Sequence, residues 1–125
     1  MQLKLLDHAY VLLRYPPETD VTMRRDEGCE FFSLTKTPNE VSVFCEETKM
    51  PELQPEKIEA GWRGLYVDEP MEFSDIGVMK RLADPLAAAE ISILALSTFD
   101  TDYVFVQSRH LNQAITELHK AGFTW

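Results

Sequence analysis

The side chains of this 125-residue chain that could act as nucleophiles or metal ligands are scattered along it. The two cysteines, Cys29 and Cys45, have no CxxC spacing, and neither has a recognisable base that would activate its thiol. His110 and His119 are nine positions apart, so they share no tight helix face on which to bind a metal. The sequence therefore predicts no catalytic residue, no metal site and no cofactor.

Two polar segments could instead hold a small zwitterion. Ser74 and Asp75 precede apolar residues at helical spacing, and the backbone N–H groups at a helix start suit a carboxylate. Asp102, in a turn between two apolar runs, suits an ammonium or guanidinium group. Each feature also has a purely structural explanation, because serine and aspartate commonly cap helices and turns favour aspartate. Residue spacing alone leaves both explanations open.

The second half of the chain must position these segments, and its pattern is regular. We expect a strand over 62–68, a helix over 76–87, a central strand over 91–98, a strand over 103–107, and a helix that starts at Ser108 and ends before Gly122. This β-α-β-β-α order is typical of a ferredoxin-like fold, an α+β class with both helices on one face of an antiparallel sheet. Its last strand is missing, so the N-terminal half or a second copy of the chain must cover the open sheet edge.

The first half consists mainly of expected strands. These cover 3–6 and 10–15, followed by a hairpin with arms at 31–37 and 41–46 around Pro38-Asn39. The charged stretch 18–28 has no apolar stripe. The segment 47–61, with two prolines and a glycine, is the linker and has a helical turn near 55–60. We therefore divide the chain into halves at 1–58 and 59–125, and expect no ligand site in the first.

Composition indicates which classes of partner are disfavoured and which cellular compartment to expect. The formal net charge of -9 disfavours binding to nucleic acid or to an anionic membrane, because both need a clustered basic face. No run approaches the ~18 apolar residues that a membrane span needs, and the N-terminus has no continuous signal-peptide core. We expect a cytoplasmic protein with two reduced cysteines.

The segment GWRGLYVDEPMEFSDIGVMKRLADPLAAAEISILALSTFDTDYVFV resembles the ACT-domain family, in the branch of small bacterial ACT proteins and CASTOR-type arginine sensors. The most specific elements are EFSDIG and STFDTDY, and FFSLTKTPNEVSVFCEE extends the likeness loosely into the first half. The resemblance implies a tandem of two ferredoxin-like ACT halves, the first of them degenerate. It also implies an allosteric amino-acid sensor, not an enzyme, with its ligand at a junction between ACT units. Its partners would be further copies of itself or a regulated protein.

Carried over residue by residue, the resemblance implies a ligand site at Glu72, Phe73, Ser74, Gly77, Thr98, Phe99 and Asp102. The sequence departs from the family pattern at Asp75 and Ile76. Together with Glu72 and Asp102, Asp75 favours a ligand with a cationic side chain, arginine or lysine. Two alternatives remain open: a protein–protein interaction module without a ligand, and a small enzyme on a ferredoxin-like fold.

Overall fold

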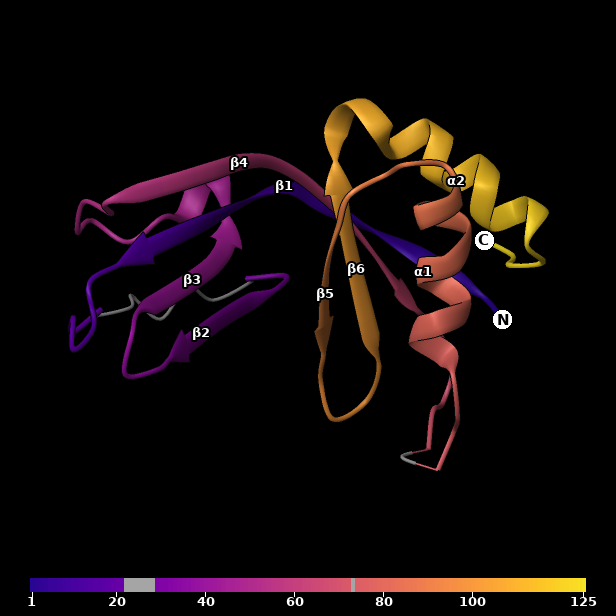
Figure 1. Cartoon of the computed structure of the whole chain (residues 1–125), viewed down its shortest axis with the longest axis horizontal. Helices are drawn as coiled ribbons and strands as arrows, with labels where there is room; N and C mark the ends of the chain where they lie inside the picture. The colour runs from indigo at the N-terminus through magenta and orange to yellow at the C-terminus, as the bar shows by residue number, and fades with distance from the viewer. Residues whose placement is uncertain (22–28, 73) are drawn as a thin grey trace. The chain divides into compact units, whose positions relative to one another are not determined.

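The computed structural model of the chain describes residues 1–21, 29–72 and 74–125, which form two compact units. Unit 1 comprises Met1–Leu6 and Trp62–Trp125, and unit 2 comprises Asp7–Gly61. Strands β1 (Leu3–Tyr15) and β4 (Lys57–Val67) run through both units (Figure 1). The first six residues thus belong with the second half of the sequence.

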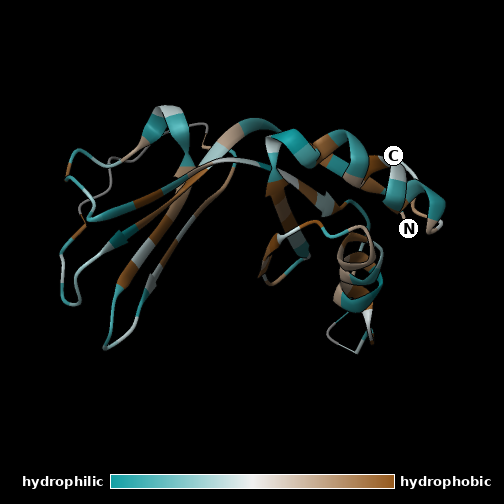
Figure 2. Cartoon of the chain, turned by 45° about the horizontal axis from the view of Figure 1, so that its top comes forward, coloured by the Kyte–Doolittle hydropathy of each residue, from teal (hydrophilic) through white to brown (hydrophobic). Residues whose placement is uncertain are grey.

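Unit 1 has the ferredoxin-like arrangement predicted for the second half. Its remaining elements are α1 (Val78–Ala88), β5 (Ile93–Ser97), β6 (Asp102–Gln107), the 3₁₀ turn η2 (Ser108–His110) and α2 (Leu111–Lys120). The antiparallel sheet has the order β1-β4-β6-β5 within this unit. Buried leucines of α1 and α2, Leu82 and Leu118 among them, pack against the sheet residues Leu65 and Val104. Both helices show alternating hydrophobic and hydrophilic surfaces in Figure 2, consistent with one buried face each.

The N-terminal segment occupies the place of the missing strand in unit 1. The Asp68 N–H donates to the Gln2 carbonyl at 2.9 Å, which sets the start of β1 beside the end of β4. On its other side the Leu3 N–H donates to the Thr124 carbonyl at 2.7 Å, and the Thr124 N–H donates to the Met1 carbonyl at 2.9 Å. Of the two ways to cover this sheet edge, the structure uses the chain's own N-terminus.

Unit 2 contains the predicted hairpin and is built almost entirely of strands. It holds β2 (Phe32–Lys36), β3 (Val41–Glu46), the 3₁₀ turn η1 (Glu47–Lys49), and the later part of β1 and the earlier part of β4. Its core lies on one sheet face, where Val11 and Leu13 of β1 meet Val43 and Cys45 of β3. Of the charged stretch 18–28, residues 22–28 lie outside the described part of the chain.

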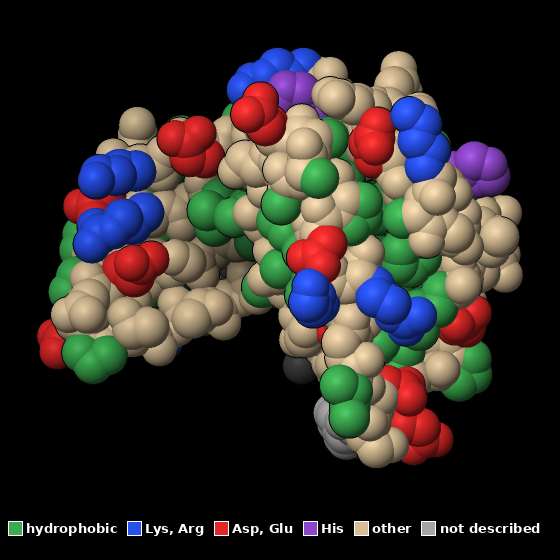
Figure 3. Space-filling view, turned by 45° about the vertical axis from the view of Figure 1, so that its right-hand side comes forward, with side chains coloured by type: hydrophobic (Ala, Val, Ile, Leu, Met, Phe, Trp, Pro, Cys, Tyr) green, Lys and Arg blue, Asp and Glu red, His purple; other side chains and the backbone are tan. Residues whose placement is uncertain are grey.

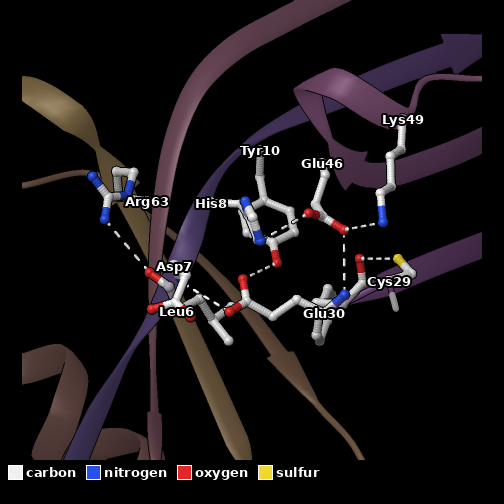
Figure 4. Close-up of polar contacts among 10 residues, drawn as sticks. Leu6, Asp7, His8, Tyr10, Cys29, Glu30, Glu46, Lys49 and Arg63 are labelled. Carbon is white, nitrogen blue, oxygen red and sulfur yellow. Dashed lines mark hydrogen bonds and ion pairs between the residues drawn. The ribbon is translucent and has the colours of Figure 1, made fainter. Parts of the chain in front are cut away.

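A polar cluster on the other face of unit 2 fixes the residues that precede β2 (Figure 4). The carboxylate of Glu46, 1% exposed, accepts the Glu30 N–H at 3.2 Å and lies 3.3 Å from His8 Nε2. The Glu30 carboxylate accepts the Tyr10 hydroxyl at 2.7 Å and the Asp7 N–H at 2.8 Å. Burial and the Glu30 carboxylate raise the pKa of Tyr10, so its hydroxyl remains a donor. These contacts tie β1, β3 and the segment before β2 together around the buried Glu46 carboxylate.

Three sequence-based expectations about elements are wrong. The strand over 91–98 is not central: β5 is the edge strand, and β6 lies between it and β4. The helical turn near 55–60 is absent, because β4 already begins at Lys57, where the Glu56 N–H donates to the Arg14 carbonyl of β1. The two N-terminal strands are one continuous strand, since Asp7 and His8 continue β1 with their side chains turned to polar partners and solvent. In each case pairing with a distant strand overrides the local pattern.

Gly64 of β4 is required by close packing, because the ring of Phe105 crosses its backbone. A Cβ at this position would lie 2.6 Å from Phe105 Cε1 and 2.8 Å from Leu6 Cδ1. We expect Gly64→Ala to lower the free energy of unfolding by about 1–3 kcal/mol in urea denaturation. The loss should shrink in a Phe105→Leu background, which removes the ring edge; an undiminished loss would contradict this packing.

The pairing of the N-terminus with unit 1 predicts the effect of truncating Leu3. This side chain is 1% exposed and packs in the core of unit 1. Leu3→Ala should cost about 2–5 kcal/mol of unfolding free energy. The matched control is Leu53→Ala, at a side chain 47% exposed, which should change stability by no more than about 0.5 kcal/mol. Equal small losses would place the first residues outside the unit 1 core.

Candidate functional site

A cavity of about 340 Å³ opens in unit 1 between the segment that leads into α1 and the turn that joins β5 to β6. Its size falls within the range of small-molecule pockets, roughly 300–1,000 Å³. Both segments that sequence analysis singled out for a zwitterion contribute to it. The lining residues are Met71, Glu72, Asp75, Gly77, Val78, Met79, Lys80, Ser97, Thr98, Phe99, Asp100, Thr101 and Asp102.

The first wall is a tight turn followed by the start of α1. The Asp75 N–H donates to the Glu72 carbonyl at 2.9 Å, and the Glu72 N–H donates to Asp75 Oδ2 at 2.8 Å. The chain then enters α1 through Gly77, whose φ of 76° is a conformation that glycine adopts without steric cost. The Asp75 carboxylate therefore closes this turn, and Gly77 occupies the position at the start of the helix.

The structural explanation left open by the sequence, in which Ser74 or Asp75 caps the helix, is wrong. The N-cap is Gly77, and the structure shows no side-chain hydrogen bond to this cap. The reason is the turn itself, because Asp75 Oδ2 is already engaged by the Glu72 N–H. The first-turn N–H groups of α1, with the positive end of the helix dipole, are thus left at the cavity wall that Gly77, Val78 and Met79 form.

The second wall is held by hydrogen bonds within the β5–β6 turn. Ser97 and Asp102 are paired across the two strands, and Ser97 Oγ donates to Asp102 Oδ1 at 2.6 Å. The Thr98 N–H donates to the Thr101 carbonyl at 2.9 Å, which closes the turn. Thr101 Oγ1 donates to the Val67 carbonyl at 2.7 Å and so anchors the turn to β4. Ser97 of β5 therefore orients the Asp102 carboxylate, and the turn next to Asp102 is anchored to β4.

Five of the seven predicted site residues line the cavity together. They are Glu72, Gly77, Thr98, Phe99 and Asp102. Ser74 is exposed and is not among the lining residues, and Phe73 lies outside the described part of the chain. Sequence reasoning missed Lys80, three positions after Gly77, although the i, i+3 spacing from the helix start would have placed it on the same face.

Charge at the cavity is predominantly negative. Four carboxylates line it, those of Glu72, Asp75, Asp100 and Asp102, against the ammonium of Lys80. Lys80 Nζ in addition contacts the Asp84 carboxylate one helical turn further along α1. The site thus offers carboxylate acceptors for a cation beside helix N–H donors for an anion, which is the combination that a zwitterion needs.

The thiols are poorly suited to nucleophilic chemistry. Burial raises the pKa of Cys29, and burial together with the neighbouring Cys29 raises the pKa of Cys45 to about 11. A thiol with such a pKa is protonated at neutral pH and reacts slowly.

Within the described residues there is no group of three or more His, Cys, Asp and Glu side chains placed to hold a metal ion. The same residues include no helix of the length and apolar character that crossing a membrane requires.

Comparison with known proteins identifies relatives of this chain. A family model described as an ACT domain matches residues 57–120. The chain is 35% identical over 103 residues to the bovine (Bos taurus) cytosolic arginine sensor for mTORC1 subunit 1, and 34% identical over 103 residues to the human protein of that name. Each match covers 75% of this chain and 31% of the relative. The chain thus spans about a third of the length of these relatives.

Solved structures extend the likeness to nearly the whole chain. A crystal structure of an Agobacterium tumefaciens protein, 28% identical, superposes with a TM-score of 0.86 and covers 98% of this chain and 90% of that one. The regulatory subunit of aspartate kinase from Thermus thermophilus, 14% identical, superposes with a TM-score of 0.68 and covers 96% and 97%, which shows a shared fold. Together with the match over 57–120 and the ferredoxin-like unit 1, these findings place the chain in the ACT-domain family, in the branch of the CASTOR-type sensors.

Proposed function

We propose that this chain is an amino-acid-binding regulatory protein whose ligand is a free amino acid held in the unit 1 cavity. The observation that carries the proposal is the juxtaposition, in one cavity, of the uncapped start of α1 and the Asp102 carboxylate. The relatives support it, because two of them are named as arginine sensors and a protein of the same fold is a regulatory subunit. Within the cavity the proposal assigns the ligand to Glu72, Gly77, Thr98, Phe99 and Asp102. Phe73 and Ser74, the other two residues that the family resemblance implied, belong to the segment that leads into α1.

The two charged groups of an amino acid have complementary places in this cavity. The ligand carboxylate accepts hydrogen bonds from the first-turn N–H groups of α1, near Gly77 and Val78. The ligand ammonium lies toward Asp102, whose orientation Ser97 fixes. Charge-assisted hydrogen bonds contribute ~1.5–3 kcal/mol each, so three of them supply ~4.5–9 kcal/mol before ordering costs, which is of the order of the ~8 kcal/mol that micromolar binding needs.

The remaining carboxylates favour a ligand with a cationic side chain. Glu72, Asp75 and Asp100 line the same cavity, so a guanidinium or ammonium group at the end of the ligand would lie among acceptors. A ligand with a second carboxylate would be repelled by the same residues. We therefore infer arginine or lysine as the preferred ligand.

The ligand acts by regulation and not by turnover. Binding at a junction between ACT units would change how strongly those units, further copies or a regulated protein associate. The size of this change is set by the difference in ligand affinity between the associated and the dissociated state. The first half, with its strand-built unit 2, acts as a degenerate ACT half without a ligand of its own. We place the protein in the cytosol, in line with the cytosolic arginine sensors that it resembles.

The decisive residue is Asp102. In calorimetric titration with the best amino acid from a thermal-shift panel, Asp102→Ala should weaken binding by ~2 kcal/mol or more, because the ligand cation loses its fixed acceptor. The fold should survive, since Asp102 is only half-buried and lies at the end of a strand.

The matched control is Asp20→Ala, which removes an exposed carboxylate in unit 2 and should leave the affinity unchanged. Equal affinities of wild type and Asp102→Ala would place the ligand elsewhere. If no amino acid bound at all, the exposed apolar side chains of unit 1 would favour an interaction module instead. Steady turnover of any substrate by the purified protein would contradict the regulatory assignment.

Charge selectivity gives an independent check. Arginine and citrulline have almost the same shape, but citrulline has no positive charge on its side chain. Arginine should bind at least about tenfold more tightly, and its advantage should fall as salt rises from 50 to about 500 mM. Competition between the two ligands, followed by calorimetry, measures the ratio. Equal affinities would show that the cavity carboxylates do not contact the ligand side chain.

A further inference from the structure

The segment Met1–Leu3 is docked on unit 1 by one isolated bridge and a few backbone hydrogen bonds. Gln2 pairs with Thr124 in that bridge, and the Asp68 N–H donates to the Gln2 carbonyl at 2.9 Å. The two ends of the chain accordingly lie side by side in both Figure 1 and Figure 2. Burial of Leu3, which is 1% exposed, favours the docked state. Pairing this short opens at a lower cost than the core strands do, so docking is a local equilibrium of its own.

The β5–β6 turn, one wall of the cavity, reaches this segment through the end of β4. Thr101 Oγ1 donates to the Val67 carbonyl at 2.7 Å and lies 3.4 Å from Met71 Sδ. Val67 is followed directly by Asp68, whose N–H donates to the carbonyl of Gln2. A turn that lines the cavity is therefore only two hydrogen bonds away from the docked segment.

The other wall, at the start of α1, reaches the same segment by separate contacts. The Arg81 N–H donates to the Gly77 carbonyl at 3.0 Å, and Arg81 Nη2 donates to Met1 Sδ at 3.5 Å. The Gln2 N–H donates at 3.2 Å to Glu69 Oε2, in the stretch that leads from β4 to α1. Figure 3 shows this part of unit 1, with Lys and Arg side chains over the helix next to the acidic side chains beside the grey residue.

Both walls of the cavity are thus anchored on one short segment. Hydrogen bonds along a sheet edge are ordinary, and by themselves they would affect only stability. Here, however, contacts from two different elements, each forming one wall, converge on the same three residues. A ligand that contacts both walls restrains their positions, and the docked segment restrains the same walls from the other side. Two restraints that favour one arrangement favour each other.

We propose that docking of the Met1–Leu3 segment and binding of an amino acid in the unit 1 cavity stabilise one another, so that the ligand regulates the docking. The part that concerns the ligand rests on the proposed function, whereas the link between the segment and the cavity walls rests on the hydrogen bonds alone. In the undocked state the N–H groups of Asp68 and Thr124 lose their partners and Leu3 leaves the core. The amino acid thereby controls whether this edge of β4 is covered.

Hydrogen exchange of single amides, followed by NMR, tests the coupling. The amides of Leu3, Asp68 and Thr124 donate the docking bonds, and saturating arginine should slow their exchange at least about fivefold. Thr101→Val keeps the shape of the side chain but removes the donor to β4. It should speed exchange of the Asp68 amide at least about threefold without arginine, and reduce the slowing by arginine to below about twofold. The matched control is Thr116→Val, whose hydroxyl donates within α2, and it should behave like the wild type.

The reciprocal measurement starts from the docked segment. Thr124→Pro removes the N–H that donates to the Met1 carbonyl, whereas Thr124→Val keeps it. In calorimetry Thr124→Pro should bind arginine at least about threefold more weakly, but by no more than the factor by which arginine slows exchange in the wild type. That limit holds because coupling between two equilibria is the same in both directions. Thr124→Val should stay within about twofold of the wild type.

The outcomes separate this inference from the proposed function. If arginine binds but leaves exchange at the docking amides unchanged, the inference is overturned and the proposed function stands. If Thr101→Val speeds exchange at Asp68 and Thr124→Pro speeds it at Thr98, but no amino acid binds, the proposed function fails while the link between segment and walls stands. The reference is the Ile91 amide, which donates to the Leu86 carbonyl after α1. Equal acceleration there would show a general loss of stability and would overturn the inference.

Discussion

The structure of unit 1 depends on the hydrogen bonds that pair the first residues of the chain with Asp68 and Thr124. Without them β4 would be an edge strand with unpaired backbone groups, and the helix-covered core would lack Leu3. With them β4 is internal, and its Val67 carbonyl can hold the turn after β5 through Thr101. The position of Asp102 in the cavity is therefore traceable, contact by contact, to a strand that begins some hundred residues earlier.

Much of this arrangement could be predicted from sequence, and the misses have physical reasons. The hairpin around Pro38-Asn39 and the helix that carries Leu82 and Leu86 follow from local turn chemistry and apolar spacing. The edge position of β5 and the single long β1 depend on pairing between distant strands, which no local window contains. A run of apolar residues looks the same whether it lies at the centre or at the edge of a sheet.

The candidate site, like the fold, could be predicted only in part. Family resemblance, not spacing, led to Glu72, Gly77, Thr98, Phe99 and Asp102, and the structure brings these five to one cavity. Ser74 and Asp75 looked like helix caps because their residue types are the usual ones. Gly77 is the N-cap instead, because the Asp75 carboxylate already accepts the Glu72 N–H within the turn that precedes α1. A turn that closes on its own side chain cannot be distinguished from a cap by residue type alone.

At the cavity, α1 departs from the usual preference for a side chain that caps the helix start. A site that binds an anion there would need the N–H groups that such a side chain would occupy. An N-cap side chain stabilises a helix by about 1 kcal/mol, yet α1 begins at Gly77 without one. The acidic side chains nearby offset part of this cost, because a negative charge near a helix start interacts favourably with its dipole. The same carboxylates repel one another, and the cation of the proposed ligand would relieve that repulsion. A site with this excess of negative charge would gain most from a cationic ligand, in keeping with the ligand proposed above.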